Sequence, residues 1–310
     1  MNHYDVLVIG GGAGGMAAAL SALENGYRKI LIAERKESLG GILLQCTHKG
    51  FGLGYFGEDL SGLEYAERFQ LKVQRTEIQV RCKTMVLRLY PNQTALLSGT
   101  DGIEKVAFDV CVLATGCRER TLYSQEISGP RPAGIMTAGT AQKLMNVDGL
   151  EIGDEIIIAG TGDVGQIMAG QLSLSGKRII AMIEKEDHPG GLKRNQENYL
   201  KALHIPVILN SVITRVHGRK RIEGVEIRNL LTGELSSLKC STLLTAIGMI
   251  SETDLLKTSF GKEAIPDWLI KVGNCKYVHE IVDSVTADGL QLWDMFKRRP
   301  HSRTWNCENR

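Results

Sequence analysis

The hydrophobic pattern near the start of the chain changes from the period of a strand to that of a helix and back. Residues 4–9 form a short apolar run rich in Val and Ile, which is typical of a strand buried on both faces. Residues 13–23 have the small residues and the spacing of a helix, and residues 29–33 form a second buried strand. This order predicts a strand, helix, strand unit with parallel strands.

The same order of elements returns in the second half of the chain. Residues 155–159 predict a buried strand, residues 166–175 a helix, and residues 178–183 a second strand. A meander-like alternation and a closing apolar strand follow each unit: 85–89, 94–97 and 106–107 before 109–114, and 213–217 and 224–229 before 243–247. Helices are also predicted over 62–74 and 192–204, and a strand over 269–272 precedes a last helix beyond Gly273. The repeat predicts an α/β fold with two doubly wound, Rossmann-like domains.

A glycine-rich turn joins the first strand to the helix in each repeat. The glycines have the GxGxxG spacing in both: Gly10, Gly12 and Gly15, then Gly160, Gly162 and Gly165. The first glycine permits a tight turn, the second admits a pyrophosphate close to the backbone, and the third lets the helix pack on the strand. The amides and the dipole at the helix N-terminus then favour the phosphate charge.

An acidic residue ends the second strand of each repeat, at the same distance from the first glycine. These residues are Glu34 and Glu184, and a carboxylate there can accept hydrogen bonds from both hydroxyls of an adenosine ribose. A 2′-phosphate beside Glu184 would face a like charge, so the sequence predicts a dinucleotide with a free 2′-hydroxyl at this site. Turns that merely pack are the alternative, but two fingerprints in matching context favour two dinucleotide sites.

Composition and charge exclude several other classes of protein. The formal net charge is +2, too small for a nucleic-acid or membrane-surface footprint. The uncharged stretch 6–23 contains five glycines and follows Asp5 with no basic segment, so we expect a soluble, cytoplasmic protein without a membrane span. The seven cysteines include no CxxC and no metal-ligand spacing, so neither a disulfide framework nor a metal site is predicted.

Together these motifs resemble the pyridine-nucleotide disulfide oxidoreductase superfamily. The turn Ala114-Thr115-Gly116, its relative Ala246-Ile247-Gly248, and Gly273-Asn274 extend the resemblance over nearly the whole chain, at about the length of a thioredoxin reductase. The resemblance implies FAD on the first fingerprint and a nicotinamide nucleotide on the second. It assigns to FAD Gly10, Gly12, Gly15, Glu34, Gly41, Thr115, Gly116 and Asn274, and to NADH Gly160, Gly162, Asp163, Gly165 and Glu184.

The resemblance also implies a domain plan. The FAD-binding domain is expected to be discontinuous, with residues 1–117 and 243–310, and the NAD(P)-binding domain is the insert 118–242. Residues 118–120 and 240–242 would then form a paired hinge. The expected architecture is similar to that of thioredoxin reductase, without the C-terminal interface domain of lipoamide-type reductases.

Four segments resemble a narrower group, the FAD-dependent oxidoreductases found with bacterial anaerobic-type glycerol-3-phosphate dehydrogenases. They begin Gly40-Gly41-Ile42-Leu43, Gly52-Leu53-Gly54-Tyr55, Pro132-Ala133-Gly134-Ile135 and Gly273-Asn274-Cys275-Lys276. Subunits of dye-linked amino-acid dehydrogenases are more distantly similar. The resemblance implies a partner dehydrogenase subunit and fixes no substrate. Association of the chain with itself stays open.

Three residues are candidates for chemistry beyond binding. Cys46 and His48 follow the glycine pair expected near the flavin, where an imidazole can favour a thiolate, or where both can serve only local structure. His279 is expected to open the last helix, either as a proton donor or acceptor for substrate or as a contact to ribityl or backbone atoms. Hydride transfer between nicotinamide and flavin itself needs no protein acid or base.

Three functions are therefore open from the sequence. In the first, FAD mediates electron transfer between NAD(H) and a partner dehydrogenase subunit or a small acceptor. In the second, the chain is a stand-alone reductase or oxidase with Cys46 as redox thiol. In the third, it is a flavin-bound assembly or redox-sensing protein without catalysis. The missing CxxC near residues 137–142 disfavours an intrachain disulfide relay, and the basic tail 298–310 receives no assignment.

Overall fold

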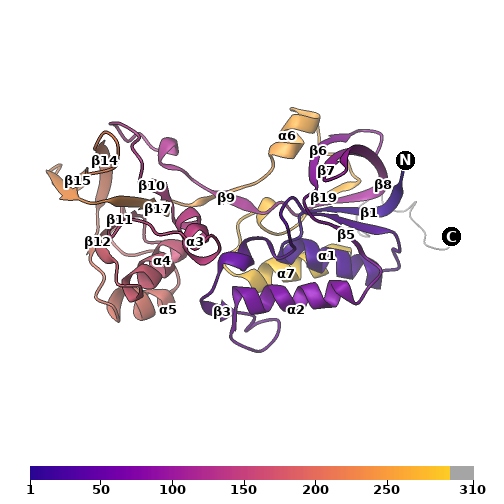
Figure 1. Ribbon diagram of the computed structural model, residues 1–310, viewed down its shortest axis with the longest axis horizontal. Coiled ribbons are helices and arrows are strands. Elements are labelled where there is room, and N and C mark those ends of the chain that lie inside the picture. Colours follow the sequence, from indigo (N-terminus) through magenta and orange to yellow (C-terminus); the bar gives the residue numbers. More distant parts are fainter. Residues whose placement is uncertain (294–310) are drawn as a thin grey trace. The chain divides into compact units, whose positions relative to one another are not determined.

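The computed structural model describes residues 1–293, and the chain forms two compact units (Figure 1). The first unit joins Met1–Arg118 to the chain from Ser251 onward, and the second is Glu119–Ile250. Cys307 and the tail 298–310 lie outside the described residues. Within residues 1–293, no helix combines the length and the apolar sequence that crossing a bilayer requires.

The first unit is built on a seven-stranded sheet of order β5-β2-β1-β8-β7-β6, with β19 paired to β8. Its strands are β1 (His3–Ile9), β2 (Ile30–Ala33), β5 (Gln79–Arg81), β6 (Met85–Tyr90), β7 (Thr94–Gly99), β8 (Gly102–Leu113) and β19 (Leu269–Lys271). β8 is one strand where the sequence predicts two. Its first half pairs antiparallel with β7 and its second half parallel with β1, so the meander continues into the closing strand.

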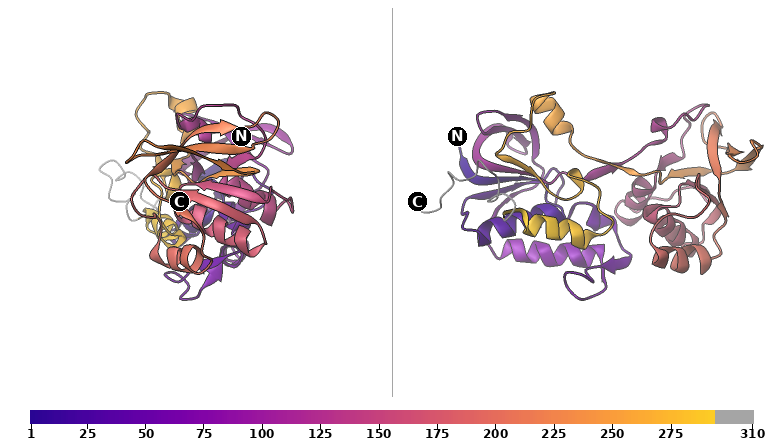
Figure 2. Two further views of the ribbon diagram at one scale, coloured as in Figure 1. Left: turned by 90° about the vertical axis from the view of Figure 1, so that its left-hand side faces the viewer. Right: turned by 180° about the vertical axis from the view of Figure 1, so that it is seen from behind.

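Helices cover one face of the parallel part of this sheet, as Figure 1 and Figure 2 show for α1 (Ala13–Glu24), α2 (Gly62–Gln74) and α7 (Val282–Leu290). Met16, Phe69 and Trp293 are fully buried in the core between these helices and the strands. A second core lies under the meander and α6 (Asp254–Phe260). Short elements complete the unit: η1 (Gly41–Gln45), β3 (Lys49–Phe51), β4 (Leu60–Ser61) and η4 (Gly273–Cys275).

The second unit has a five-stranded parallel sheet of order β10-β17-β11-β12-β13. The strands are β10 (Ile135–Thr137), β11 (Glu155–Ala159), β12 (Arg178–Ile183), β13 (Val207–Ile208) and β17 (Thr242–Thr245). A three-stranded antiparallel sheet follows β13: β14 (Ser211–His217), β15 (Gly224–Asn229) and β16 (Leu235–Lys239). The helical elements are η2 (Leu122–Ser124), α3 (Ala138–Asn146), α4 (Asp163–Leu174), α5 (Lys193–Asn195) and the π-helix η3 (Gln196–Lys201).

The helix predicted over 192–204 is in fact a short α-helical turn followed by the π-helix η3. The wider turn accompanies close packing of the Tyr199 ring on α4. A Cβ added at Gly170 of α4 would lie 2.1 Å from that ring, so only glycine leaves room for it. The π-helical turn thus coincides with close packing against a helix distant in sequence.

The two connections between the units, β9 (Cys117–Glu119) and β18 (Met249–Ser251), pair as a two-stranded sheet. The hinge predicted at 240–242 is therefore wrong, and the boundary predicted at 243 falls inside the second unit. The reason is that β17 pairs with both β10 and β11 and belongs to the second sheet. Apolar strands that end a domain look alike in sequence, and only their pairing assigns them.

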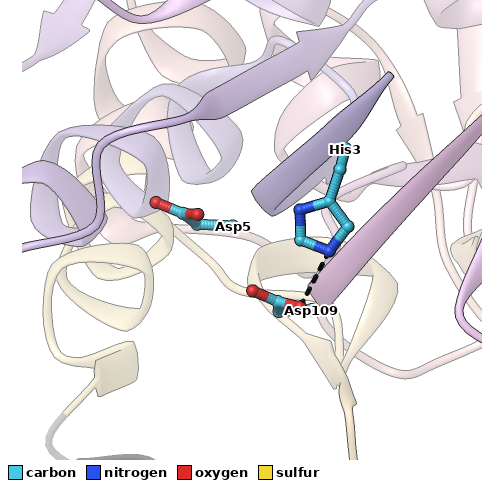
Figure 3. A group of neighbouring side chains, drawn as sticks. All are labelled: His3, Asp5 and Asp109. Carbon is cyan, nitrogen blue, oxygen red and sulfur yellow. Dashed lines mark ion pairs between the residues drawn. The ribbon is translucent and has the colours of Figure 1, made fainter. Parts of the chain in front are cut away.

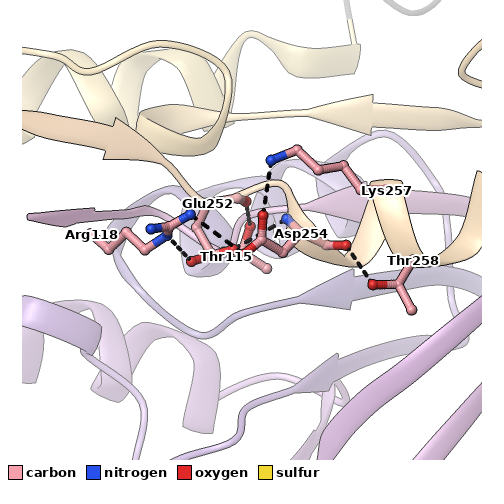
Figure 4. Close-up of polar contacts among 6 residues, drawn as sticks. All are labelled: Thr115, Arg118, Glu252, Asp254, Lys257 and Thr258. Carbon is pink, nitrogen blue, oxygen red and sulfur yellow. Dashed lines mark hydrogen bonds and ion pairs between the residues drawn. The ribbon is translucent and has the colours of Figure 1, made fainter. Parts of the chain in front are cut away.

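In the first unit, Arg118 is held by the residues just after β18. Its guanidinium forms ion pairs with Glu252 at 3.1 Å and with Asp254 at 3.5 Å (Figure 4). The hydroxyl of Thr115 donates to the carbonyl of Glu252 at 2.6 Å, and the Glu252 amide donates to the carbonyl of Gly116. Both connections are therefore fastened where they leave this unit.

Candidate dinucleotide sites

The first glycine turn has the shape that a dinucleotide pyrophosphate requires. Gly10 has a φ of +103°, and an added Cβ would lie 2.4 Å from the carbonyl oxygen of Ala114. A Cβ at Gly15 would lie 1.9 Å from the carbonyl oxygen of Gly10. The nearest heavy atom to a Cβ at Gly12 is the Cα of Gly41, 4.0 Å away. Gly10 and Gly15 thus serve the turn itself, while Gly12 keeps a space that a ligand can enter.

The second glycine turn repeats this geometry. Gly160 has a φ of +93°, and an added Cβ would lie 2.4 Å from the carbonyl oxygen of Ala246. A Cβ at Gly165 would lie 2.9 Å from the Cβ of Ala246. Gly162 again has open space, with no neighbour closer than 4.0 Å. Gly12 and Gly162 are the N-caps of α1 and α4, and neither cap has a side-chain bond to the first-turn amides. These amides can therefore donate to the oxygens of a bound phosphate.

Glu34 is buried at the end of β2 and is fixed by backbone amides. Its Oε2 accepts from the amide of Gly11 at 2.7 Å and its Oε1 from the amide of Lys36 at 2.8 Å. A carboxylate has about four acceptor positions, so each oxygen keeps a further one for a ribose hydroxyl. The geometry fits the role that the fingerprint predicts.

Glu184 is likewise buried, at the end of β12. Its Oε2 accepts from both the amide and the hydroxyl of Thr161, and its Oε1 accepts from the amide of Glu186 at 3.2 Å. Thr161 belongs to this site although neither the glycine spacing nor the position of the acid predicts it. The available signal was a hydroxyl residue between the first two glycines of the second fingerprint, where the first fingerprint has Gly11.

The other residues assigned to FAD gather around the first glycine turn. A Cβ added at Gly41 would lie 3.1 Å from the Cα of Gly12, and one added at Gly14 would lie 3.8 Å from the Cα of Gly273. Thr115 and Gly116 follow the carboxyl end of β8, beside the turn. The turn, η1, η4 and the end of β8 therefore meet at one edge of the sheet.

His279 does not open a helix as predicted, because α7 begins at Val282. Its amide donates to the Oδ1 of Asn274 at 2.9 Å, and its Nδ1 lies 3.2 Å from the same oxygen. The imidazole also stacks on Tyr277, with ring centroids 4.2 Å apart. These local contacts favour a structural role for His279, and they engage the Asn274 side chain that was assigned to FAD.

Cys46 is buried in a setting that keeps its thiol protonated. Burial raises the pKa of this thiol to about 12, and Sγ donates to the carbonyl of Ile42 at 3.5 Å. His48 is half-buried, with Nδ1 2.9 Å from the carbonyl oxygen of Lys49 and its ring against Phe51. A reactive thiolate needs the opposite environment, so these contacts count against the redox-thiol interpretation.

Asp163, assigned to the nicotinamide nucleotide, supports a loop in this structure. Its Oδ1 accepts from the amide of Leu192 and from Nδ2 of Asn195, both at 2.7 Å. The side chain thereby ties the start of α5 to the first turn of α4.

The first turn of α3 lies near residues 137–142, where a thioredoxin reductase would have a CxxC motif and this chain has none. Thr137 caps the helix by accepting from the amide of Thr140, and the two hydroxyls lie 2.8 Å apart. Both carboxylate oxygens of Glu119 accept from the amide of Gly139 at 3.0 Å. Hydroxyls and a carboxylate hold this helix end, and none of these groups exchanges electrons.

Among the described residues, one group of three side chains has the spacing of metal ligands: His3, Asp5 and Asp109 (Figure 3). It lies where β1 starts, at the edge of the sheet opposite the glycine turn. Asp5 Oδ2 accepts from the amides of Arg28 and Lys29, and His3 pairs with Asp109 at 3.0 Å. The bonds to Asp5 hold the α1–β2 loop against the sheet. They indicate that this group stabilises the fold, away from the dinucleotide sites.

Two glycine turns with open second glycines and buried acids define a protein with two dinucleotide-binding units. A family model described as "Pyridine nucleotide-disulphide oxidoreductase" matches residues 4–272, and the chain belongs to that family. It is therefore an FAD-containing, NAD(P)H-dependent oxidoreductase.

Similar proteins include two subunits of larger enzymes. Hydrogen cyanide synthase subunit HcnB of Pseudomonas protegens is 31% identical over 57% of this chain and 38% of its own length. Sarcosine oxidase subunit alpha of Corynebacterium sp. is 30% identical over 59% of this chain and 19% of its own length. The match thus spans less than half of either relative. Thioredoxin reductase of T. acidophilum has a similar structure, with a TM-score of 0.77, 19% identity, and coverage of 96% of this chain and 99% of that one.

Proposed function

We propose that this chain transfers electrons between NADH and a partner dehydrogenase subunit by way of FAD. The observation that carries the proposal is the pair of matched glycine turns, one in each unit, with open space at Gly12 and at Gly162. FAD, when bound, supplies the chemistry, because it exchanges a hydride with nicotinamide and passes electrons on to an acceptor. The assignment of FAD to the first unit and NADH to the second rests on the family resemblance of the motifs.

The chain's own residues bind and orient the two cofactors in this proposal. The first-turn amides of α1 hold the FAD pyrophosphate and Glu34 holds its adenosine ribose. The first turn of α4 and Glu184 do the same for NADH. No protein group has to donate or accept a proton during hydride transfer, so the proposal assigns no catalytic acid to His48 or His279.

The partner subunit is proposed from the relatives and from the chain's own chemistry. HcnB and the sarcosine oxidase alpha chain are both named as subunits. Cys46 is a buried thiol, and the first turn of α3 has hydroxyls where a thioredoxin reductase has its redox cysteines. The resemblance of residues 40–48 and 132–142 favours a partner of the glycerol-3-phosphate dehydrogenase type. The proposal places the protein in the cytoplasm, where NADH is abundant.

Anaerobic titration of the FAD-loaded chain with NADH tests the first half of the proposal. We expect the visible absorbance of the oxidised flavin to bleach as NADH is added. Gly162→Val is the matched control, because it should keep FAD and lose the bleaching by NADH. A wild-type flavin that NADH does not reduce would favour the non-catalytic alternative and contradict the proposal.

Affinity purification from the native host tests the second half. We expect a second dehydrogenase subunit to co-purify, and its substrate to reduce the FAD of this chain in the complex. Cys46→Ser should leave that reduction unchanged. Full turnover of a natural substrate by the isolated chain, abolished in Cys46→Ser, would instead establish the stand-alone reductase.

A further inference from the structure

The two glycine turns differ at the residue between their first two glycines. In the first unit this residue is Gly11, whose amide donates to Glu34. In the second unit it is Thr161, whose amide donates to Glu184 at 3.0 Å in the same way. Thr161 also contributes a hydroxyl, and the residue is completely buried although it lies in a turn at the end of a strand. A buried hydroxyl must be paired, so its partners show what it does.

The hydroxyl of Thr161 joins two parts of the second unit. It accepts from the amide of Gly190 at 2.9 Å and is hydrogen-bonded to Oε2 of Glu184. Because the Gly190 amide can only donate, the single proton of the hydroxyl is directed to the Glu184 carboxylate. Glu184 Oε2 therefore receives two bonds from one residue, which fixes the rotation of its side chain.

Hydrogen bonds with Thr161 and Gln166 also hold the segment between Glu184 and α5 against the glycine turn. The amide of Gly190 is held by Thr161, and its carbonyl accepts from Nε2 of Gln166 at 2.7 Å. That Nε2 also donates to the carbonyl of Thr161, and Gln166 is completely buried. In the first unit the corresponding closure is a backbone bond, from the amide of Gly40 to the carbonyl of Gly11 at 2.7 Å.

The closed segment begins with charges that do not suit a 2′-phosphate. Glu186 and Asp187 follow Glu184 directly. The two basic residues of this stretch contact these acids: Lys185 pairs with Glu186 at 3.1 Å, and His188 lies 2.6 Å from Asp187. A nucleotide with a 2′-phosphate would meet like charges, whereas free ribose hydroxyls can donate to Glu184.

We infer that Thr161 is a positioning residue for coenzyme choice, which acts by holding Glu184 and the segment 185–191 in the arrangement that accepts an adenosine ribose and excludes its 2′-phosphate. This inference rests on the proposed preference for NADH and adds the residue that maintains it. Loss of the hydroxyl removes one of two bonds to Glu184 Oε2 and leaves the Gly190 amide without its acceptor. The carboxylate and the segment then gain alternative positions.

The test measures binding of ADP-ribose and of its 2′-phosphate to the full-length, FAD-loaded protein by isothermal titration calorimetry. These probes contain the adenosine part of NADH and NADPH and undergo no redox reaction. We expect Thr161→Val to weaken ADP-ribose binding roughly 5- to 30-fold, as loss of one to two hydrogen bonds predicts, and the 2′-phosphate analogue much less. The dissociation constant of the 2′-phosphate analogue divided by that of ADP-ribose should therefore fall. Thr161→Ser, which keeps the hydroxyl, should stay near wild type.

Kinetic and control measurements distinguish positioning from general support of the fold. In Thr161→Val, KM for NADH should rise while kcat for flavin reduction changes little. FAD content should be unchanged, since that cofactor is assigned to the other unit. If the Val variant does not fold, Thr161→Gly replaces it, because glycine occupies this place in the first unit.

Two outcomes have different consequences. If wild-type protein discriminates between the probes and both Thr161→Val and Thr161→Gly retain the full ratio, the inference about Thr161 is overturned while the proposed NADH preference stands. If wild-type protein binds both probes equally, the proposed preference fails and the inference fails with it.

Discussion

The space beside Gly12 gives the sharpest test of the FAD assignment. Gly12 is the N-cap of α1, with a φ of −75° that any residue adopts. An added Cβ would have no neighbour closer than 4.0 Å, so Gly12→Ala or Gly12→Val should fold. A side chain there would instead occupy the approach of the pyrophosphate. The change therefore acts on the ligand and leaves the protein's own packing intact.

The expected loss of affinity follows from the bonds that the side chain would displace. A pyrophosphate at a helix N-terminus accepts about two charge-assisted hydrogen bonds from first-turn amides, each worth roughly 1.5–3 kcal/mol. Losing both costs about 3–6 kcal/mol, which weakens FAD binding roughly 10²- to 10⁴-fold at about 1.4 kcal/mol per factor of ten. Gly12→Val should therefore purify largely without flavin.

The assay is the ratio of flavin absorbance to protein absorbance after purification, followed by titration of the apoprotein with FAD. Gly162→Val is the matched variant, because its added Cβ also has no neighbour closer than 4.0 Å. It should retain FAD and lose binding of NADH. Gly15→Ala is the opposite control, since its Cβ would lie 1.9 Å from the carbonyl oxygen of Gly10 and should damage the fold. Stoichiometric FAD in Gly12→Val, together with loss of FAD in Gly162→Val, would show that the two cofactors are assigned to the wrong units.

Three further predictions concern Glu184, Cys46 and Arg118. In stopped-flow measurements, wild-type kcat/KM for flavin reduction should favour NADH over NADPH roughly 10- to 150-fold. Glu184→Ser should lower this preference for NADH. Equal rates with the two coenzymes in wild type would refute the role of Glu184. Because burial raises the pKa of Cys46 to about 12, its thiolate is scarce at neutral pH, so alkylation followed by mass spectrometry should be slow at pH 8 and accelerate toward pH 11; rapid labelling of native protein at pH 7 would contradict this. Arg118→Ala should lower the free energy of unfolding in urea by less than about 1 kcal/mol, because the side chain is half exposed; a larger loss would mean that its pair with Glu252 is stronger than an exposed ion pair.

The repeated strand, turn and helix, and with them the two glycine turns, could be predicted from local sequence patterns. The strands 155–159 and 178–183 and the helix 62–74 have the predicted bounds in the structure. These elements are specified locally. A strand buried on both faces must be apolar throughout, and Gly10 and Gly160 adopt a backbone conformation that side chains disfavour.

Other features depend on partners distant in sequence, so local patterns could not predict them. The strand near residue 243 joins the second sheet because it pairs with β10 and β11. The helix near Tyr199 has a π-helical turn where that ring packs on Gly170. The state of the Cys46 thiol follows from burial, which its neighbours in sequence do not reveal. The bonds from Thr161 to Glu184 and Gly190 span separate parts of the chain, so no local pattern could contain them. Glycine spacing specifies where a nucleotide can approach, but the contacts that position the selecting carboxylate form only when the strand, the turn and the following loop meet.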